Sequence, residues 1–204
     1  MKYVKGLALA ACASVALLAL FGASSASATQ LTCTEPAGTK VFCPVGAEIH
    51  SEAEGSVVLD PPFGKIECGE ATGFGSLTEA GSSTTTPSGT PALTTLGKCN
   101  ATVTVLQKGT LEVHTRNASA DNNGLFTSTG TEVTVEFIGT HCIFKTNGTT
   151  VGTLTGSSTT KKTATLDIEA TIPRTGGRSG AFCGATAALT GSLIVTKPDW
   201  LDID

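Results

Sequence analysis

The stretch Ala101-Thr-Val-Thr-Val-Leu-Gln-Lys-Gly-Thr-Leu-Glu-Val-His-Thr115 decides the fold class. Apolar and polar side chains alternate on both sides of Gly109, which is typical of strands with one covered and one wet face. A two-residue turn ending at Gly109 would set Val105 beside Glu112. A three-residue turn, with Gly109 in the left-handed conformation, sets Val105 opposite Leu111 and leaves one wholly apolar face. We therefore predict an antiparallel hairpin with the longer turn.

Two later segments carry turn signals of the same kind. Residues 128–130 contain a glycine between two apolar-alternating segments and predict a second hairpin. Asn147-Gly148 is the strongest short turn signal in the chain, and a two-residue turn there would set Phe144 opposite Val151.

Residues 163–172 show the most regular alternation and extend the β pattern toward the C-terminus. One face of this segment is apolar and consists of Ala164, Leu166, Ile168, Ala170 and Ile172. After residue 28, no segment shows a helical period with caps. The pattern amounts to about ten short strands, which is typical of a sandwich or a barrel. We predict an all-β domain, an antiparallel β-sandwich that is immunoglobulin-like or jelly-roll-like, with three disulfides.

The first 28 residues have the pattern of a signal peptide. Lys2 and Lys5 precede an apolar run, and the small residues that follow it favour cleavage after Ala28. We therefore expect residues 1–28 to be removed and residues 29–204 to form a single domain in the secreted or cell-surface space. The alternative is a lipoprotein box ending at Cys12, but the chain stays apolar well beyond that cysteine.

Seven cysteines are present, and loss of Cys12 with the signal leaves an even set. No CxxC pair occurs, so a disulfide set is favoured over a zinc or redox site. Spacing alone does not choose the connectivity, but chain order favours neighbours in sequence. We expect the pairs Cys33 with Cys43, Cys68 with Cys99, and Cys142 with Cys183.

Charge and aromatic content argue against several partner classes. The formal net charge is −4 with no basic cluster, which disfavours nucleic acid and anionic membrane surfaces. The single tyrosine, Tyr3, lies in the expected signal, and Trp200 is the only tryptophan. Few side chains are therefore available to stack on sugars or to form an aromatic protein-binding surface.

Candidate chemical sites are each better explained as ordinary strand or turn residues. Glu48 with His50, and Glu112 with His114, share a strand face and could meet around a metal if their strands were neighbours. Residues 121–124 offer oxygens but lack the rest of a calcium loop. Two carboxylate pairs could be drawn for glycoside cleavage, Glu132 with Glu136 and Asp167 with Glu169. No hydrolase or nucleotide motif is present, and we predict no enzymatic activity, cofactor or metal.

Several short segments resemble a group of exported bacterial β-proteins without an assigned activity. The segments are Cys43-Pro-Val-Gly46, Glu48-Ile-His50, Pro62-Phe-Gly-Lys-Ile-Glu-Cys68 and Gly130-Thr-Glu-Val-Thr-Val135. The resemblance implies a bacterial surface or extracellular setting, and it implies no site residues.

We expect an exported, non-enzymatic protein of the cell envelope or extracellular space, with a structural or adhesive role and an envelope or extracellular partner. A first alternative is a module that binds a small apolar or sugar ligand. That ligand would lie between the sheets or at polar loops expected at residues 69–91, 117–124 and 175–180. A carboxylate-dependent hydrolase is the second alternative.

Overall fold

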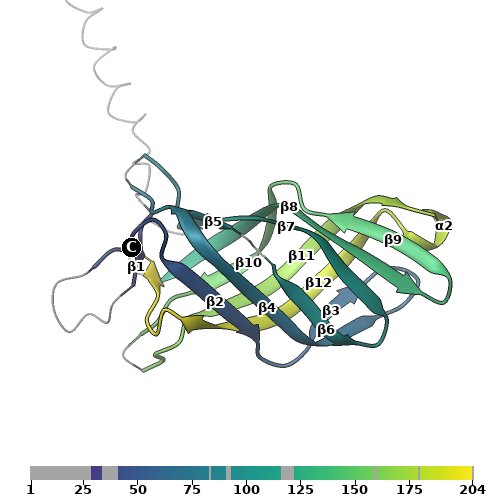
Figure 1. Cartoon of the computed structure of the whole chain (residues 1–204), viewed down its shortest axis with the longest axis horizontal. Helices are drawn as coiled ribbons and strands as arrows, with labels where there is room; N and C mark the ends of the chain where they lie inside the picture. The colour runs from purple at the N-terminus through teal and green to yellow at the C-terminus, as the bar shows by residue number, and fades with distance from the viewer. Residues whose placement is uncertain are drawn as a thin grey trace, which may run out of the picture.

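The computed structural model describes residues 29–33, 41–82, 84–90, 93–115, 122–158, 160–178 and 180–203. The expected signal peptide, residues 1–28, lies outside these. Strands account for nearly all the regular structure (Figure 1). They are β1 (Leu31–Thr32), β2 (Glu48–Ala53), β3 (Val57–Asp60), β4 (Ile66–Glu79), β5 (Ser88–Thr90), β6 (Thr95–Cys99), β7 (Thr102–Thr115), β8 (Asn123–Phe137), β9 (Thr140–Lys145), β10 (Thr149–Thr155), β11 (Thr165–Gly177), β12 (Thr186–Lys197) and β13 (Asp202–Ile203). A single helical turn, α2 (Gly180–Cys183), precedes β12.

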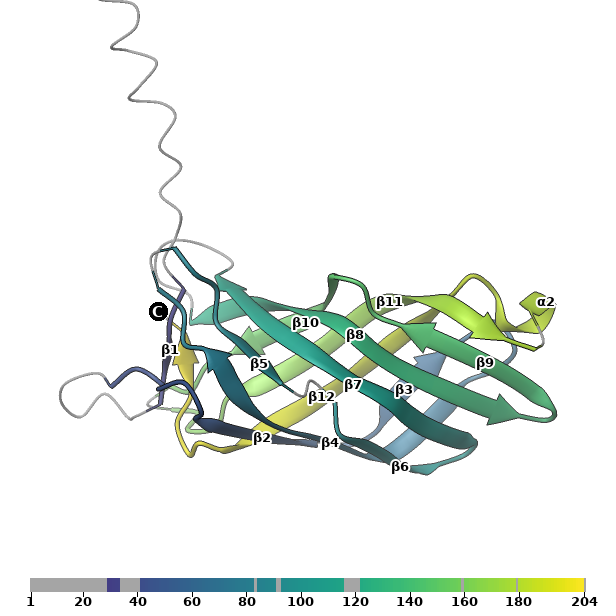
Figure 2. The ribbon, with the colours of Figure 1, turned by 45° about the horizontal axis from the view of Figure 1, so that its top comes forward.

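The main sheet closes on itself into an eight-stranded antiparallel β-barrel. Five long strands, β4, β7, β8, β11 and β12, occupy one position each around the ring (Figure 2). Each of the other three positions holds two short strands in succession: β2 then β3, β5 then β6, and β9 then β10. Neighbours around the ring follow chain order, so the barrel is a simple up-and-down arrangement.

The predicted β-sandwich is therefore wrong, although the all-β class is confirmed. The ring closes where β12 pairs with both β2 and β3, for example Leu193 opposite Ala53 and Leu189 opposite Leu59. A sandwich would leave these strands at sheet edges with unpaired backbone groups, whereas closure satisfies them. The alternation of residues is the same in both architectures, because each has one covered face and one wet face.

The hairpin predicted around Gly109 does not form, and neither does the one at residues 128–130. Instead β7 continues past Gly109 and β8 continues past Gly130 without a chain reversal. The two strands pair with each other along their whole length, with Val105 opposite Val133. Gly109 and Gly130 have φ of 63° and 77° and lie in facing parts of the two strands. Left-handed glycine in mid-strand produces a bend in the ladder rather than a chain reversal.

The predicted apolar face of this segment is nevertheless confirmed. Its apolar side chains pack against the barrel core, and their polar neighbours Thr104 and Glu112 are exposed. These core-facing side chains are Val103, Val105, Leu111 and Val113. The ladder shifts register between Val105 and Gln107. The register shift reverses the in–out alternation of β7 once, and the left-handed Gly109 reverses it again. The side chains of Leu111 and Val113 therefore point to the same inner face as those of Val103 and Val105.

Gly109→Ala is expected to destabilise the barrel more than Gly130→Ala. A Cβ at Gly109 would collide with the backbone nitrogen and the hydroxyl of Thr131, whereas the nearest atom to a Cβ at Gly130 is 3.9 Å away. Both variants carry the left-handed strain of about 1–2 kcal/mol. Gly109→Ala must also displace the backbone at Thr131, so its free energy of unfolding should fall by more than about 3 kcal/mol in total. Urea titrations of the two variants measure the difference, and equal losses would contradict the close packing of β7 on β8.

The Asn147-Gly148 turn is also not a hairpin. It joins β9 to β10, which follow one another between β8 and β11, and β10 pairs with β8 and β11. Phe144 consequently lies opposite Val133 rather than Val151. The turn separates two short strands that run in the same direction, so the chain does not reverse. Both β9 and β10 pair with the long strands β8 and β11 on either side instead of with each other.

Both ends of the barrel carry additional structure. The β1–β13 pair and the C-terminal segment lie at one end, and α2 lies at the other (Figure 1). Leu31, Leu201 and Ile203 are buried at the first end. The three disulfides are Cys33–Cys43, Cys68–Cys99 and Cys142–Cys183, the pairs expected from chain order. They join, respectively, the segment after β1 to the segment before β2, β4 to β6, and β9 to α2.

Candidate functional site

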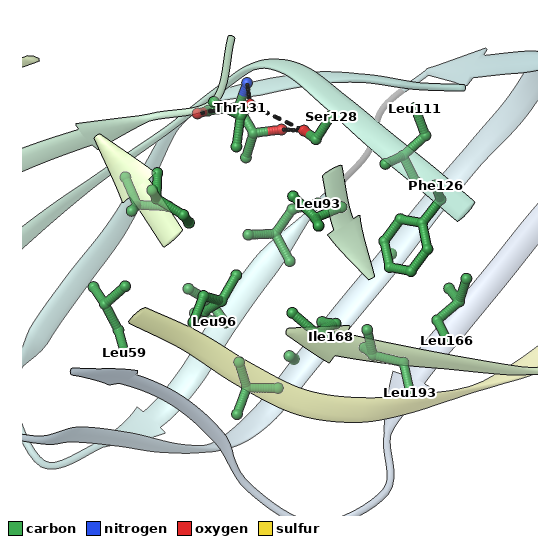
Figure 3. A pocket seen from close by; sticks show the side chains of 18 of the residues that line it. Leu59, Leu93, Leu96, Leu111, Phe126, Ser128, Thr131, Leu166, Ile168 and Leu193 are labelled. Carbon is green, nitrogen blue, oxygen red and sulfur yellow. Dashed lines mark hydrogen bonds between the residues drawn. The ribbon is translucent and has the colours of Figure 1, made fainter. Parts of the chain in front are cut away.

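The barrel interior contains an apolar cavity of about 100 Å³. It lies among side chains contributed by strands from all around the ring (Figure 3). Those labelled in the figure are Leu59, Leu93, Leu96, Leu111, Phe126, Ser128, Thr131, Leu166, Ile168 and Leu193. A second apolar cavity of about 80 Å³ shares Leu111, Phe126 and Leu166 with the first and extends toward Leu31 and Leu201. The two spaces are therefore neighbours along the barrel, with Phe126 lining both.

Small side chains create this space. Inward positions of β2 and β4 alternate with outward ones, and at the cavity they are occupied by Ser51, Ala71 and Gly73. Ser51 and Gly73 lie directly opposite each other in the ladder. An eight-stranded barrel is just wide enough for large side chains to fill its interior. Where Ser51, Ala71 and Gly73 stand in place of large side chains on adjacent strands, the side chains of the opposite wall are too short to fill the space, and a cavity remains.

One wall of the cavity carries three hydroxyl groups. Ser128 and Thr146 are almost fully buried, at 3% and 4% exposure, and Thr131 is half-buried. The Ser128 Oγ lies 2.8 Å from Thr131 Oγ1 and 3.0 Å from Thr146 Oγ1. The Thr131 hydroxyl donates to the carbonyl of Lys108, and the Thr131 backbone N–H donates to Thr146 Oγ1. The cluster is held together by its own hydrogen bonds at the point where Gly109 and Gly130 bend the two strands.

No titratable side chain is among the described residues that line either cavity. Charged groups lie instead on the outside of the barrel. Lys197 donates a hydrogen bond to Glu48 and, with its positive charge, lowers the pKa of that carboxyl. Glu67 likewise raises the pKa of Lys65 by accepting its hydrogen bond. The described lining of the interior is thus suited to an uncharged occupant.

The Glu–His pairs considered as metal ligands are not brought together. His50 Nε2 lies 3.7 Å from Glu48, and His114 Nε2 lies 3.6 Å from Glu112, but β4 and β5 stand between the two strands that carry them. His141 lies near Glu136 instead, at 3.9 Å. Within the described ranges, no group of three or more His, Cys, Asp or Glu side chains is placed to hold a metal ion.

The carboxylate pairs considered for glycoside cleavage lie on outward faces. Glu132 pairs with Lys145, and Asp167 accepts a hydrogen bond from Ser192. The expected loop at residues 69–91 is largely strand, because β4 runs to Glu79. Residues 175–177 belong to β11 and lie at the α2 end, whereas residues 80–82 and 84–87 lie at the opposite end (Figure 1), where Gln30 donates to the Gly81 carbonyl. Most of the remaining expected loop, residues 117–121, lies outside the described residues. The described parts of the first and third of these segments in chain order therefore do not gather at one end of the barrel, as the loop version of the ligand-binding alternative required.

A hollow on the outer surface, near the start of β2, is lined by Glu48, His50, Lys197 and Trp200. Nε2 of His50 and Nε1 of Trp200 are buried and have no hydrogen-bond partner among the described residues. Because both nitrogens are covered, a solute in the hollow could reach neither without rearrangement. The interior cavity is therefore the stronger candidate site.

Sequence reasoning missed the cavity residues. Ser51, Ser128 and Thr146 occupy inward positions, but serine and threonine are so frequent in these strands that inward and outward ones look alike. Only the parity of each strand separates them, and the bends at Gly109 and Gly130 disturb that parity. Gly73 carried a usable signal, since glycine within a strand pattern indicates a close backbone approach or an absent side chain.

Comparison with known proteins yields no match to a protein-family model, to a curated protein or to a solved structure. The part of the earlier resemblance that the structure supports is a disulfide-bonded all-β protein. Three disulfides indicate an oxidising, extracytoplasmic environment. Of the residues that the structure describes, no helix has the length and hydropathy of a membrane span.

Proposed function

We propose that this protein is an exported binding module that holds one small, uncharged, mainly apolar molecule inside its barrel. The observation that carries the proposal is the pair of adjoining apolar cavities of about 100 and 80 Å³. Protein interiors are close-packed, and voids cost stability. Here Ser51, Ala71 and Gly73 open such space on two adjacent strands. Apolar cavities of this size stay free of water and accept small apolar ligands.

The chemistry of the cavity favours binding over turnover. Its lining offers apolar side chains with a few convergent hydroxyl groups, which is the usual composition of a small-molecule site. None of the described residues of the lining presents a carboxylate, an imidazole or a thiol to a bound molecule. A structural or adhesive role in the envelope, in a bacterial surface or extracellular setting, remains a second proposal. It rests on the expected signal peptide, on the cysteines and on the resemblance to exported bacterial β-proteins.

Ala71→Leu is expected to abolish binding of a small apolar probe. Ala71 is buried and lines the larger cavity, so three added carbons occupy the space that the probe would take. Benzene at about ten times its Kd should raise the Tm of the mature wild-type chain by roughly 3–6 °C. The same benzene concentration should leave the Tm of Ala71→Leu unchanged, as differential scanning calorimetry would show.

Ala188→Leu provides the matched control, because Ala188 is exposed on β12. Its response to benzene should equal that of the wild type. The proposed interior site is wrong if benzene fails to raise the Tm of the wild type, or if it raises the Tm of the wild type, Ala71→Leu and Ala188→Leu equally.

A further inference from the structure

One polar side chain lies where the two cavities meet. Five residues line both cavities and so mark the junction between them: Ser51, Gly73, Leu111, Phe126 and Leu166. Figure 3 shows the last three of these together on one side of the larger cavity. Only Ser51 among the five has a polar side chain, so the polarity of the junction depends on its hydroxyl group.

The Ser51 hydroxyl points into the barrel. Side chains alternate between the two faces of a strand, and Ile49 and Ala53, on either side of Ser51 in β2, both pack against the core. Ser51 therefore shares their inward direction, and it is only 8% exposed. The neighbouring His50 points the other way, and its ring lies against that of Phe74 with 4.3 Å between the ring centroids. The hydroxyl is thus directed at the space that the two cavities share.

Ser51 differs from the other hydroxyl groups buried in the lining. Ser128 and Thr146 hydrogen-bond to each other at 3.0 Å. Ser51 Oγ makes no hydrogen bond with any residue that the structure describes, and a buried hydroxyl without a partner lowers stability. A water molecule would find few of the polar partners that it needs, because the lining is almost wholly apolar. A ligand oxygen at the junction therefore gains a hydrogen bond that the protein alone lacks.

The cavity volumes limit the chain on either side of that oxygen. An apolar cavity of about 150 Å³ holds one benzene ring, or about 25 Å³ for each carbon. At this ratio the larger cavity, of about 100 Å³, takes about four non-hydrogen atoms, and the second, of about 80 Å³, takes about three. An occupant that fills both cavities is therefore elongated, and its middle lies beside Ser51.

We propose that the ligand is an unbranched, uncharged chain that spans both cavities and carries one oxygen near its middle, which accepts a hydrogen bond from the Ser51 hydroxyl. This inference rests on the proposed function and names its ligand class. A ketone, an ether or a secondary alcohol has such an oxygen, whereas an alkane has none. A carboxylate or an ammonium group would bury a charge without a partner, since no charged side chain is among the described residues of the lining.

The test compares two isomers that differ only in the place of the oxygen, 4-heptanone and 2-heptanone. In 4-heptanone equal arms flank the carbonyl and match the two cavities. In 2-heptanone a carbonyl beside Ser51 leaves a single methyl on one side and a long arm that overfills the cavity on the other. Each ketone is titrated into the mature, disulfide-bonded chain, and NMR follows the methyl groups of Leu193 in the larger cavity and Leu154 in the second. We expect 4-heptanone to shift both leucines and to bind roughly fivefold more tightly than 2-heptanone, which corresponds to one net hydrogen bond.

Ser51→Ala is the variant that tests the assigned group. It should reduce the preference for 4-heptanone over 2-heptanone to about onefold. Without ligand its Tm should equal or exceed that of the wild type, because the substitution removes an unpaired hydroxyl. Ser128→Ala is the matched control, since it removes a hydroxyl that lines only the larger cavity and is bonded to Thr131 and Thr146. It should lower the Tm by roughly 2–6 °C and keep the preference for 4-heptanone.

Each outcome bears on a different claim. If benzene, which can lie across the junction, raises the wild-type Tm but the two ketones bind equally tightly, the central oxygen is wrong and the apolar cavities stand. A preference that persists in Ser51→Ala, or a shift of only one of the two leucines, also overturns the assignment. So does a Tm of Ser51→Ala well below that of the wild type, because the hydroxyl would then already be bonded. If neither benzene nor either ketone binds, both this assignment and the proposed function fail.

Discussion

Reduction of the three disulfides is expected to unfold the protein at 25 °C and neutral pH. The bridges close loops with sequence separations of 10, 31 and 41 residues. In the chain-entropy model these loops contribute about 2.7, 3.7 and 3.9 kcal/mol respectively. Together they supply about 10 kcal/mol, which is comparable with the whole stability of an ordinary domain. Far-UV circular dichroism and calorimetry, before and after addition of dithiothreitol, measure the loss.

Removal of one disulfide at a time should lower the free energy of unfolding by an amount that increases with the length of the loop that the disulfide closes. Replacement of Cys33 and Cys43 by alanine removes the shortest loop, at the end of the barrel where β1 lies, and should cost the least. Replacement of Cys142 and Cys183 removes the longest loop and leaves α2 without its covalent bond to β9. A reduced protein that melts within a few degrees of the oxidised one would show that strand closure alone holds the barrel.

Phe144→Ala should destabilise the protein by about 3–5 kcal/mol. Phe144 is fully buried, lies opposite Val133 inside the barrel and lines the larger cavity. Its removal loses the burial of the ring and enlarges a space that the neighbouring strands, fixed by their ladders, cannot close. For a domain of this size the Tm should fall by roughly 6–20 °C.

Phe182→Ala is the control for the same chemical change in an exposed position. Phe182 is 67% exposed on α2, so its loss should change stability by less than about 0.5 kcal/mol. Benzene should restore part of the Tm of Phe144→Ala, because it can occupy the enlarged cavity. Equal effects of the two substitutions would contradict the burial of Phe144 inside the barrel.

Local patterns in the sequence predicted the strand faces well. The apolar face of residues 163–172 points into the barrel, with Ala164, Ala170 and Ile172 buried. Chain order favoured the cysteine pairs that the structure contains, because each pair lies in neighbouring or consecutive elements. These features depend on residues that are close in sequence or on the parity of a single strand, and such information is local.

Turns were predicted less well because glycine has more than one use. Gly109 and Gly148 both have positive φ, as the turn predictions required. Yet Gly109 bends a continuous strand, and Gly148 lies between two strands that pair with others rather than with each other. The backbone conformation could be inferred from the sequence, but the partner of each flanking strand could not.

The sequence by itself determined the all-β class, the inward face of the main strands and the cysteines available for bridging. Tertiary structure alone decided that the sheet closes, since closure depends on hydrogen bonds between β12 and β2 or β3, at opposite ends of the chain. It also decided that Ser51, Ala71 and Gly73 would meet in one place and leave an apolar cavity. The physical reason is that side-chain alternation records which face is covered, whereas the curvature and closure of the sheet determine what covers it and how much space remains.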